Sequence, residues 1–377
     1  MNMPEKMKRN LSRKLFRAVV SGGLIAALTP MLLFATQEHA TDDAPRLVNA
    51  ERTTQAVSGS LSATLQTLAN ASSEAEWIGY SVERIAKEQS VCCGNYNDGE
   101  VCGTCRLEGG NHGVTTSRDS IKLESGHRLV VLLRVENHKV MRVQVASDEC
   151  TLDAGNLRFV WLTNVRPEES VQLLSGHVLD EHFQERGHDA LVNDALTAIA
   201  LHGNAAADRA FASFVSAQQP EELRKKASFW LGESRGAAGL TLLRSMAKSD
   251  SSSEVRAQVT FALSVSHEPA SLDEMIRMAR EDSSGHVRGQ ALFWLAQKAG
   301  KKAVGAISGA IENDPETDVK KKAVFALSQL PKDEGVPKLI EVATTNHNVE
   351  VRKQAMFWLG QSNDPRALDF FTKVLTQ

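Results

Sequence analysis

Apolar residues recur at a fixed interval through the C-terminal half of the chain. Within one copy they fall on the same side of a helix, as Leu223, Ala227 and Leu231 do. Clear copies begin 32 residues apart, without insertion, at Leu223, Val255, Val287, Val319 and Val351, and a fainter copy begins at Leu191. A repeat of this length predicts a solenoid, because each unit can bury its apolar face only by stacking on its neighbours.

A second apolar pattern precedes each copy and predicts another helix in every unit. One of its columns runs at the same interval through Phe211, Leu243, Met275, Ile307, Leu339 and Phe371. Each unit is therefore expected to be an antiparallel helix pair joined by a short turn. We predict an α-solenoid, a right-handed stack of about six helical hairpins over residues 166–377, preceded by a small α+β domain.

One segment of these repeats carries a family resemblance. The run Asp-Pro-Glu-Thr-Asp-Val-Lys at Asp314–Lys320, followed by Ala323, Phe325 and Leu327, resembles a HEAT repeat. More narrowly, it is similar to the short HEAT-like repeats of the phycobilisome-lyase type. The resemblance covers roughly residues 188–377. It implies the solenoid fold, but the family includes scaffolds, lyases, hydroxylases and nucleic-acid binders, so it implies no single function.

The resemblance also implies a charged ladder between neighbouring repeats. In HEAT repeats, an Asp ahead of the second helix and an Arg six residues later form such a ladder. The matching columns here are acidic and basic: Asp250, Asp282 and Asp314, and Arg224, Arg256, Arg288, Lys320 and Arg352. Lys320 lacks the planar fork of arginine, which predicts weaker pairing at its place in the ladder.

Large and small residues alternate at one position of the repeat. The column reads Ala198, Trp230, Ala262, Trp294, Ala326 and Trp358. Two interpretations remain open. The tryptophans can interdigitate with the alanines in a close-packed core, or they can form an aromatic comb on the concave face that binds a peptide or a flat ligand.

Lysines gather beside the ladder on the same helices, at Lys225, Lys226, Lys321, Lys322 and Lys353. Such a group is often no more than a solvated charged face. The alternative is an inner basic stripe that recruits an acidic segment of a partner.

The first forty residues have the pattern of an export signal or membrane anchor. Six basic residues lie in residues 1–17, and an uncharged, largely apolar run follows over residues 18–37. This run is near the lower limit for crossing a bilayer, about 17 to 20 residues. Either the signal is cleaved or residues 18–37 anchor the protein, and both interpretations predict a location in the periplasm or cell envelope.

Residues 41–75, rich in Ala, Ser and Thr, are expected to be a linker that merges into a short helix near Leu61–Ala69. Residues 76–165 are expected to form the small α+β domain. Its predicted strands are Trp77–Val82, Arg128–Val135, Val140–Ala146 and Leu157–Leu162, with a hairpin turn near Asn137 and a helix starting near Pro167.

The α+β domain holds all five cysteines of the chain: Cys92, Cys93, Cys102, Cys105 and Cys150. In an exported protein the first four are candidates for disulfides, with one thiol left over. A zinc site is a second interpretation, although the adjacent Cys92 and Cys93 fit its usual spacing poorly. A redox pair of Cys102 and Cys105 is a third, although no helix pattern follows it to lower a thiol pKa.

Composition and the absence of known motifs exclude several further classes of protein. The chain has 377 residues, a net charge of −3 and 42% hydrophobic residues, so it is a folded protein and not a disordered one. Once the basic N-terminal segment is set aside the body is acidic, which argues against general nucleic-acid binding. No phosphate loop, nucleophile elbow or zinc-protease motif is present. His267–Glu268 stands alone, whereas the HEAT-like hydroxylases hold two irons with several His-Glu pairs.

These patterns favour an exported, non-enzymatic scaffold or adaptor that presents a concave surface to a protein partner in the cell envelope. No catalytic residue, metal or cofactor is expected. Two alternatives remain: a thiol-redox or metal-binding protein centred on Cys92–Cys105, and a lyase or chaperone-like factor of the phycobilisome-lyase type.

Overall fold

The computed structural model describes residues 44–85, 91, 101–102, 104–109, 114–115, 122–123, 127–180 and 189–376. All of them belong to one compact unit, Asp43–Gln377. The export signal or anchor expected at residues 1–40 lies outside the described residues. Within the described ranges, no helix is both long enough and apolar enough to cross a membrane.

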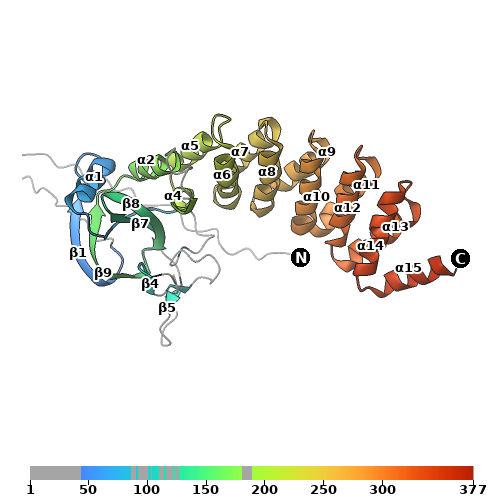
Figure 1. The fold of residues 1–377 in the computed structure, drawn as a ribbon, viewed down its shortest axis with the longest axis horizontal. Helices are drawn as coiled ribbons and strands as arrows, with labels where there is room; N and C mark the ends of the chain where they lie inside the picture. The colour runs from blue at the N-terminus through green and yellow to red at the C-terminus, as the bar shows by residue number, and fades with distance from the viewer. Residues whose placement is uncertain are drawn as a thin grey trace, which may run out of the picture. The chain divides into compact units, whose positions relative to one another are not determined.

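A mixed β-sheet forms the N-terminal domain (Figure 1). Its strands follow the order β5-β4-β9-β2-β7-β8, and β1 also pairs with β9 in parallel. The strands are β1 (Leu47–Ala56), β2 (Glu76–Glu83), β4 (Thr104–Arg106), β5 (Val114–Thr115), β7 (Arg128–Glu136), β8 (Lys139–Ser147) and β9 (Thr151–Thr163). A separate pair joins β3 (Val101–Cys102) to β6 (Lys122–Leu123).

The central strands of the sheet are buried on both faces. On one face, Ile78 and Tyr80 belong to the same apolar core as the helices α1 (Leu61–Ala71) and α2 (Pro167–Val178). On the other face, Trp77, Phe159 and Trp161 form a second core. This double burial explains why β2 and β7 are runs of mostly apolar residues and do not alternate between apolar and polar.

The β7–β8 hairpin coincides with the expected one. Asn137 and His138 form its turn with positive φ angles of 49° and 64°. Both central residues of a type I′ turn need this conformation, which matches the twist of the flanking strands.

Residues 41–75 differ from the expected linker. Leu47–Ala56 forms β1, which is paired along its length with β9. Most of its side chains are exposed, because β1 lies at an edge of the sheet. A polar edge strand and a linker have the same composition, and only pairing with a distant strand separates them.

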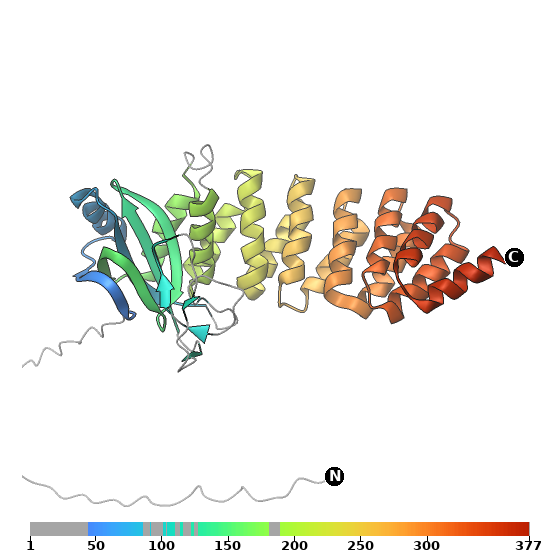
Figure 2. The ribbon, with the colours of Figure 1, turned by 60° about the horizontal axis from the view of Figure 1, so that its bottom comes forward.

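The repeats form the expected α-solenoid, in two rows of helices (Figure 2). The copies identified in the sequence form the first row, which we call the inner row: α4 (Asp189–Leu201), α6 (Glu221–Ser234), α8 (Ser253–Val265), α10 (Gly285–Ala299), α12 (Thr317–Ser328) and α14 (Val349–Gln361). The outer row contains α5 (Ala205–Phe214), α7 (Gly236–Ser249), α9 (Ser271–Glu281), α11 (Val304–Asn313), α13 (Lys332–Thr345) and α15 (Pro365–Leu375); the short helix η2 (Gly300–Ala303) precedes α11.

Neighbouring helices of the inner row approach closely. A Cβ atom placed on Gly232 of α6 would lie 2.0 Å from the carbonyl oxygen of Ala262 in α8. The first apolar residue of each copy is buried by this stacking, and Val255, Val287 and Val351 are fully so. The repeats therefore share one continuous core.

A buried polar network joins the sheet to the solenoid. The Tyr80 hydroxyl and the Nε2 atom of His202 each lie 2.8 Å from the Ser170 hydroxyl. The Nδ1 atom of His202 lies 2.7 Å from the carbonyl of Ala198, so it carries the proton and Nε2 accepts from Ser170. Because the three side chains come from β2, α2 and the residue directly after α4, they fix the sheet against the first repeat.

Candidate functional site

The charged columns form bidentate pairs between neighbouring repeats. Arg224 donates from Nε and Nη2 to Asp250 at 2.9 and 3.1 Å, and Arg256 does the same to Asp282 at 2.9 and 3.0 Å. Arg288 donates to Asp314 at 2.7 and 2.9 Å. Each carboxylate also accepts an amide at the start of the next inner helix, as Asp282 does from Ser284. These arginine and aspartate side chains connect neighbouring repeats and cap the helices, so their role is structural.

The ladder ends after these three pairs. Lys320 donates instead to the carbonyl of Glu312 at 2.8 Å. Arg352 donates to the carbonyl of Asn346 at 2.7 Å, within its own repeat. A neutral Asn346 and a lysine cannot reproduce the forked pairing, so charge coupling is weaker in the last repeat.

The tryptophans of the inner row belong to a longer array of rings that the sequence analysis missed. From Trp230 onward, a phenylalanine precedes each Trp or Ala of the alternating column, at Phe229, Phe261, Phe293, Phe325 and Phe357. The sequence alone could have revealed this column, because phenylalanine recurs in it at the same 32-residue interval. Phe229 stacks on Phe261 with ring centroids 5.9 Å apart, and Phe293 stacks on Phe325 at the same distance.

The tryptophans connect these stacked pairs. The Trp294 ring lies 4.7 Å from Phe261 and 4.9 Å from Phe293, measured between centroids. Trp358 occupies the equivalent place between Phe325 and Phe357, at 4.9 and 5.0 Å. Trp230 adjoins Phe229 at 5.1 Å. The rings therefore form a continuous array, named here the ring array, from Trp230 to Phe357.

The two interpretations of the tryptophans are thus not exclusive. All three are half-buried and pack against the shared core. The phenylalanines of the array are half-buried, except Phe357, which is 54% exposed. The tryptophans consequently hold the array in place while the phenylalanine side chains remain partly accessible.

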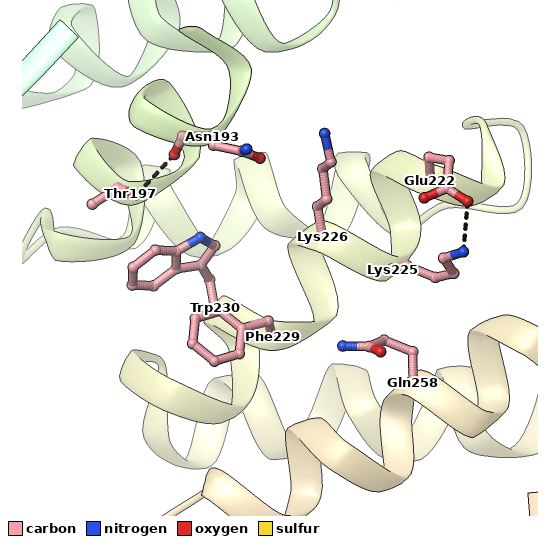
Figure 3. Close-up of a pocket in the computed structure, with 8 residues that line it drawn as sticks. All are labelled: Asn193, Thr197, Glu222, Lys225, Lys226, Phe229, Trp230 and Gln258. Atoms are coloured by element: carbon pink, nitrogen blue, oxygen red, sulfur yellow. Dashed lines mark hydrogen bonds and ion pairs between the residues drawn. The ribbon is translucent and has the colours of Figure 1, made fainter. Parts of the chain in front are cut away.

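An open pocket of about 430 Å³ lies at the N-terminal end of the ring array (Figure 3). Lys225, Lys226, Phe229 and Trp230 line it from α6, and Gln258 lines it from α8. Asn193, Thr197 and Glu222 complete the wall. The pocket therefore combines two aromatic rings with two ammonium groups, the carboxylate of Glu222 and several amide or hydroxyl groups.

A second cavity, of about 250 Å³, lies near the other end of the array. Trp358, Gln329 and Gln361 line it, together with Ser328 and Ser362. The indole N–H of Trp358 has no hydrogen-bond partner among the described residues. Each end of the array thus has a hollow bordered by a tryptophan and at least one glutamine.

Three of the lysines beside the array are paired with acids on their own helices. Lys225 bonds Glu222, Lys321 bonds Asp318 and Lys353 bonds Glu350, each three residues apart. Lys322 is exposed and its stem lies over Gly289 of α10. Lys226 faces the first pocket.

The cysteine predictions fall largely outside the described residues, which exclude Cys92, Cys93 and the side chain of Cys102. Cys105 is buried and disulfide-bonded, and its partner is not among the described side chains. Cys150 is a buried thiol in the same core. The pairing of the cysteine cluster stays a prediction.

Among the described residues, no group of three His, Cys, Asp or Glu side chains could hold a metal ion. His267 is an exposed residue of the turn after α8. Ser170 and His202 share a hydrogen bond, but both are fully buried. Burial lowers the pKa of His202 to about 4, so it stays neutral as part of the junction.

One comparison with known proteins agrees with the repeat fold. Residues 305–377 match the family model of HEAT repeats, which confirms the predicted repeat type there. Among solved structures, the chain is similar to the complex of CpcE and CpcF of phycocyanin lyase from Nostoc sp. The identity is 23%, the match covers 41% of this chain and 99% of that chain, and the TM-score is 0.32.

Two further solved structures match at lower identity. Human deoxyhypusine hydroxylase in complex with glycerol is 17% identical over 55% of this chain and 90% of that chain, with a TM-score of 0.29. A mutant of Kap121p is 15% identical over 51% of this chain and 25% of that chain, with a TM-score of 0.32. No curated protein matches the chain.

Proposed function

We propose that this protein is an exported, non-enzymatic scaffold or adaptor that binds a protein partner in the cell envelope through the inner row of its HEAT-like solenoid. The ring array carries the proposal. Half-buried aromatic rings, fixed by the tryptophans and bordered by a pocket with two lysines, provide apolar anchors beside polar groups. Protein interfaces concentrate their binding energy in such anchors.

The location rests on the N-terminal sequence. Six basic residues precede an uncharged, largely apolar run at residues 18–37, as in export signals. Cell fractionation, combined with intact mass measured under oxidising and reducing conditions, tests this part and reports cleavage and disulfides together. A full-length, reduced chain recovered from the cytosol would contradict the export proposal.

Affinity capture from the envelope fraction, with the full chain as bait, tests the binding role. The informative variant is Phe261→Ala with Phe293→Ala, which shortens the array at its centre. The matched control is Ile276→Ala with Ile340→Ala, which removes half-buried apolar side chains from the outer helices α9 and α13.

We expect a reproducible partner to be lost with the phenylalanine variant and retained with the isoleucine control. Both variants are first checked by thermal unfolding, so that a folding defect is not mistaken for lost binding. Equal recovery with the two variants, or no partner in repeated captures, would contradict the proposal.

The first pocket favours a second candidate, a lyase or chaperone-like factor for a chromophore-bearing protein. Phe229 and Trp230 offer flat apolar surfaces beside the ammonium groups of Lys225 and Lys226. A planar chromophore with carboxylate groups would match that combination. A visible absorbance band in the purified protein, lost with Trp230→Ala, would support this candidate over the scaffold.

A further inference from the structure

Lys298 caps the end of the preceding inner helix. From α10, its ammonium group donates hydrogen bonds to the carbonyls of Leu263, Ser264 and Ser266, at 3.2, 2.8 and 2.5 Å. These carbonyls belong to the last turn and the C-cap of α8, where main-chain acceptors lack a partner within the helix and the helix dipole favours a cation. An ammonium group on a four-carbon stem is therefore part of the contact between α8 and α10.

The same place two repeats later has no lysine. Ser362 takes the position of Lys298, and its hydroxyl donates to a carbonyl of its own helix, α14, at 2.7 Å. The carbonyls that correspond to the three capped ones belong to Leu327, Ser328 and Leu330. Within the described part of the chain, no side chain donates a hydrogen bond to any of these three. The end of α12 thus lacks the cap that α8 has.

The second cavity, of about 250 Å³, lies at this place, among α12, α13 and α14. The residues that correspond to Lys298 and its three acceptors all line it: Leu327, Ser328, Leu330 and Ser362. Gly335 lines it too, at the position where the earlier repeat has the fully buried Ser271. Two smaller side chains, serine in place of lysine and glycine in place of serine, therefore account for the cavity.

The rest of the cavity suits the stem and the charge of an alkylammonium group. Val336 and Leu339 of α13 are buried and provide an apolar wall. Trp358 also lines the cavity, and an aromatic ring attracts a cation that lies near its face. Among the described residues of the lining none is acidic, and the charged one, Lys332, is exposed with its ammonium 3.5 Å from the carbonyl of Asn363. The attraction for a cation thus comes from main-chain oxygens and the indole ring.

We propose that this cavity binds a primary ammonium group on an unbranched alkyl stem, such as the lysine side chain of a partner protein. Its three N–H donors would meet the carbonyls of Leu327, Ser328 and Leu330, as those of Lys298 meet their counterparts in α8. Trp358 belongs to both the cavity and the ring array, so a partner bound to the array would insert its lysine at that end. The inference rests on the proposed scaffold function only for the source of the amine.

Titration calorimetry of the full chain with n-butylamine tests the chemistry of the site. The comparison compounds are n-butyltrimethylammonium, which keeps the charge and loses the N–H donors, and butyrate. We expect about tenfold weaker binding of the trimethylated compound and no measurable binding of butyrate, because hydrogen bonds from the charged donor hold the ligand. A blocked pentapeptide with a central lysine, compared with its norleucine counterpart, shows whether a polypeptide side chain reaches the cavity.

Ser362→Lys is the informative variant, because it restores an ammonium group from within the chain. It should abolish butylamine binding and raise the midpoint of thermal unfolding by about 2 °C. Ser362→Met fills a similar volume without a donor, so it should block binding with a smaller rise. Lys332→Ala should strengthen butylamine binding about twofold by removing a like charge, whereas a site for anions would be weakened by this change.

The reverse variant is Lys298→Ser, which removes the cap of α8. Its unfolding midpoint should fall, and millimolar butylamine should restore part of the loss. Lys353→Ser, at an exposed lysine of α14, should show no such rescue.

Equal binding of butylamine to the wild type and to Ser362→Lys, or equal affinity for the amine and its trimethylated form, would overturn the inference. Binding of butylamine and of the lysine peptide supports a partner's lysine, and binding of butylamine alone supports a free alkylamine in the same site. If no amine binds while envelope capture still depends on the ring array, the ammonium inference fails and the scaffold proposal stands.

Discussion

The guanidinium of Arg288 holds the carboxylate of Asp314 in a forked pair, with both side chains almost fully buried. Hydrogen bonds to Asp314 raise the pKa of Arg288, so the guanidinium stays charged at any working pH. The same arginine also donates to the carbonyl of Asp282 at 2.9 Å. One side chain thereby connects two consecutive turns of the solenoid.

Replacing Asp314 by Ala should therefore destabilise the protein strongly. The change leaves a buried guanidinium without its main partner, which typically costs about 3–5 kcal/mol. Urea unfolding measures the loss. As a control, Lys353→Ala removes an exposed pair with Glu350 and should cost less than about 0.5 kcal/mol. Similar losses for the two variants would show that the ladder contributes no more than a surface pair.

Truncation of Trp294 to Ala tests the structural part played by the tryptophans. The ring separates Phe261 from Phe293 and packs against the core, so its loss should cost roughly 3–5 kcal/mol. Thermal or urea unfolding measures it. Unchanged stability together with lost partner binding would mean that Trp294 serves binding alone.

Two glycines at the same place of the repeat should respond in opposite directions to alanine. Gly232→Ala would bring a methyl group to 2.0 Å from the backbone of α8, and such overpacking costs about 1–3 kcal/mol or more. Around Gly360, in the last described inner helix, nothing lies within 4 Å of an added Cβ. Gly360→Ala should therefore stabilise the protein, by about 0.5 kcal/mol, through helix propensity.

Unfolding midpoints of the two glycine variants provide the measurement. If both variants lose stability, or both gain it, the result would contradict the close packing between neighbouring inner helices.

The junction histidine should make stability depend on pH. The pKa of His202 is lowered to about 4 by burial, with a smaller contribution in the same direction from Arg235. Its value in the unfolded chain is about 6.5. The unfolded state therefore takes up the proton first, and the stability present above pH 6.5 declines as the pH falls from 6.5 towards 4, by at most about 3 kcal/mol.

Urea unfolding of the wild type and of His202→Asn, at pH 7.5 and pH 4.5, isolates this effect. The pKa of Asp194 is raised to about 6, so this carboxyl contributes with the opposite sign, but it does so in both proteins. The difference in the free energy of unfolding between the wild type and His202→Asn should be smaller at pH 4.5 than at pH 7.5. A difference independent of pH would show that His202 is not the titrating group.

The repeats of this protein could be predicted because their signal is local and recurs. Helical periodicity at a 32-residue interval defines both rows of helices, and the placement of Asp250 and Arg224 in their columns follows from the same interval. The Phe229 column carried an equally regular signal. Periodicity reveals such positions because equivalent residues of stacked repeats pack against equivalent neighbours.

Contacts between distant or irregular segments could not be predicted in this way. The pairing of β1 with β9, the junction of Tyr80, Ser170 and His202, and the insertion of Trp294 between two phenylalanines each depend on three-dimensional placement. A polar edge strand has the composition of a linker, and a buried histidine has the same letter as an exposed one. The spacing of residues in the sequence indicates which secondary structure a segment can adopt. Which residues become buried, and which residues they contact, is decided only when distant segments pack together in the folded chain.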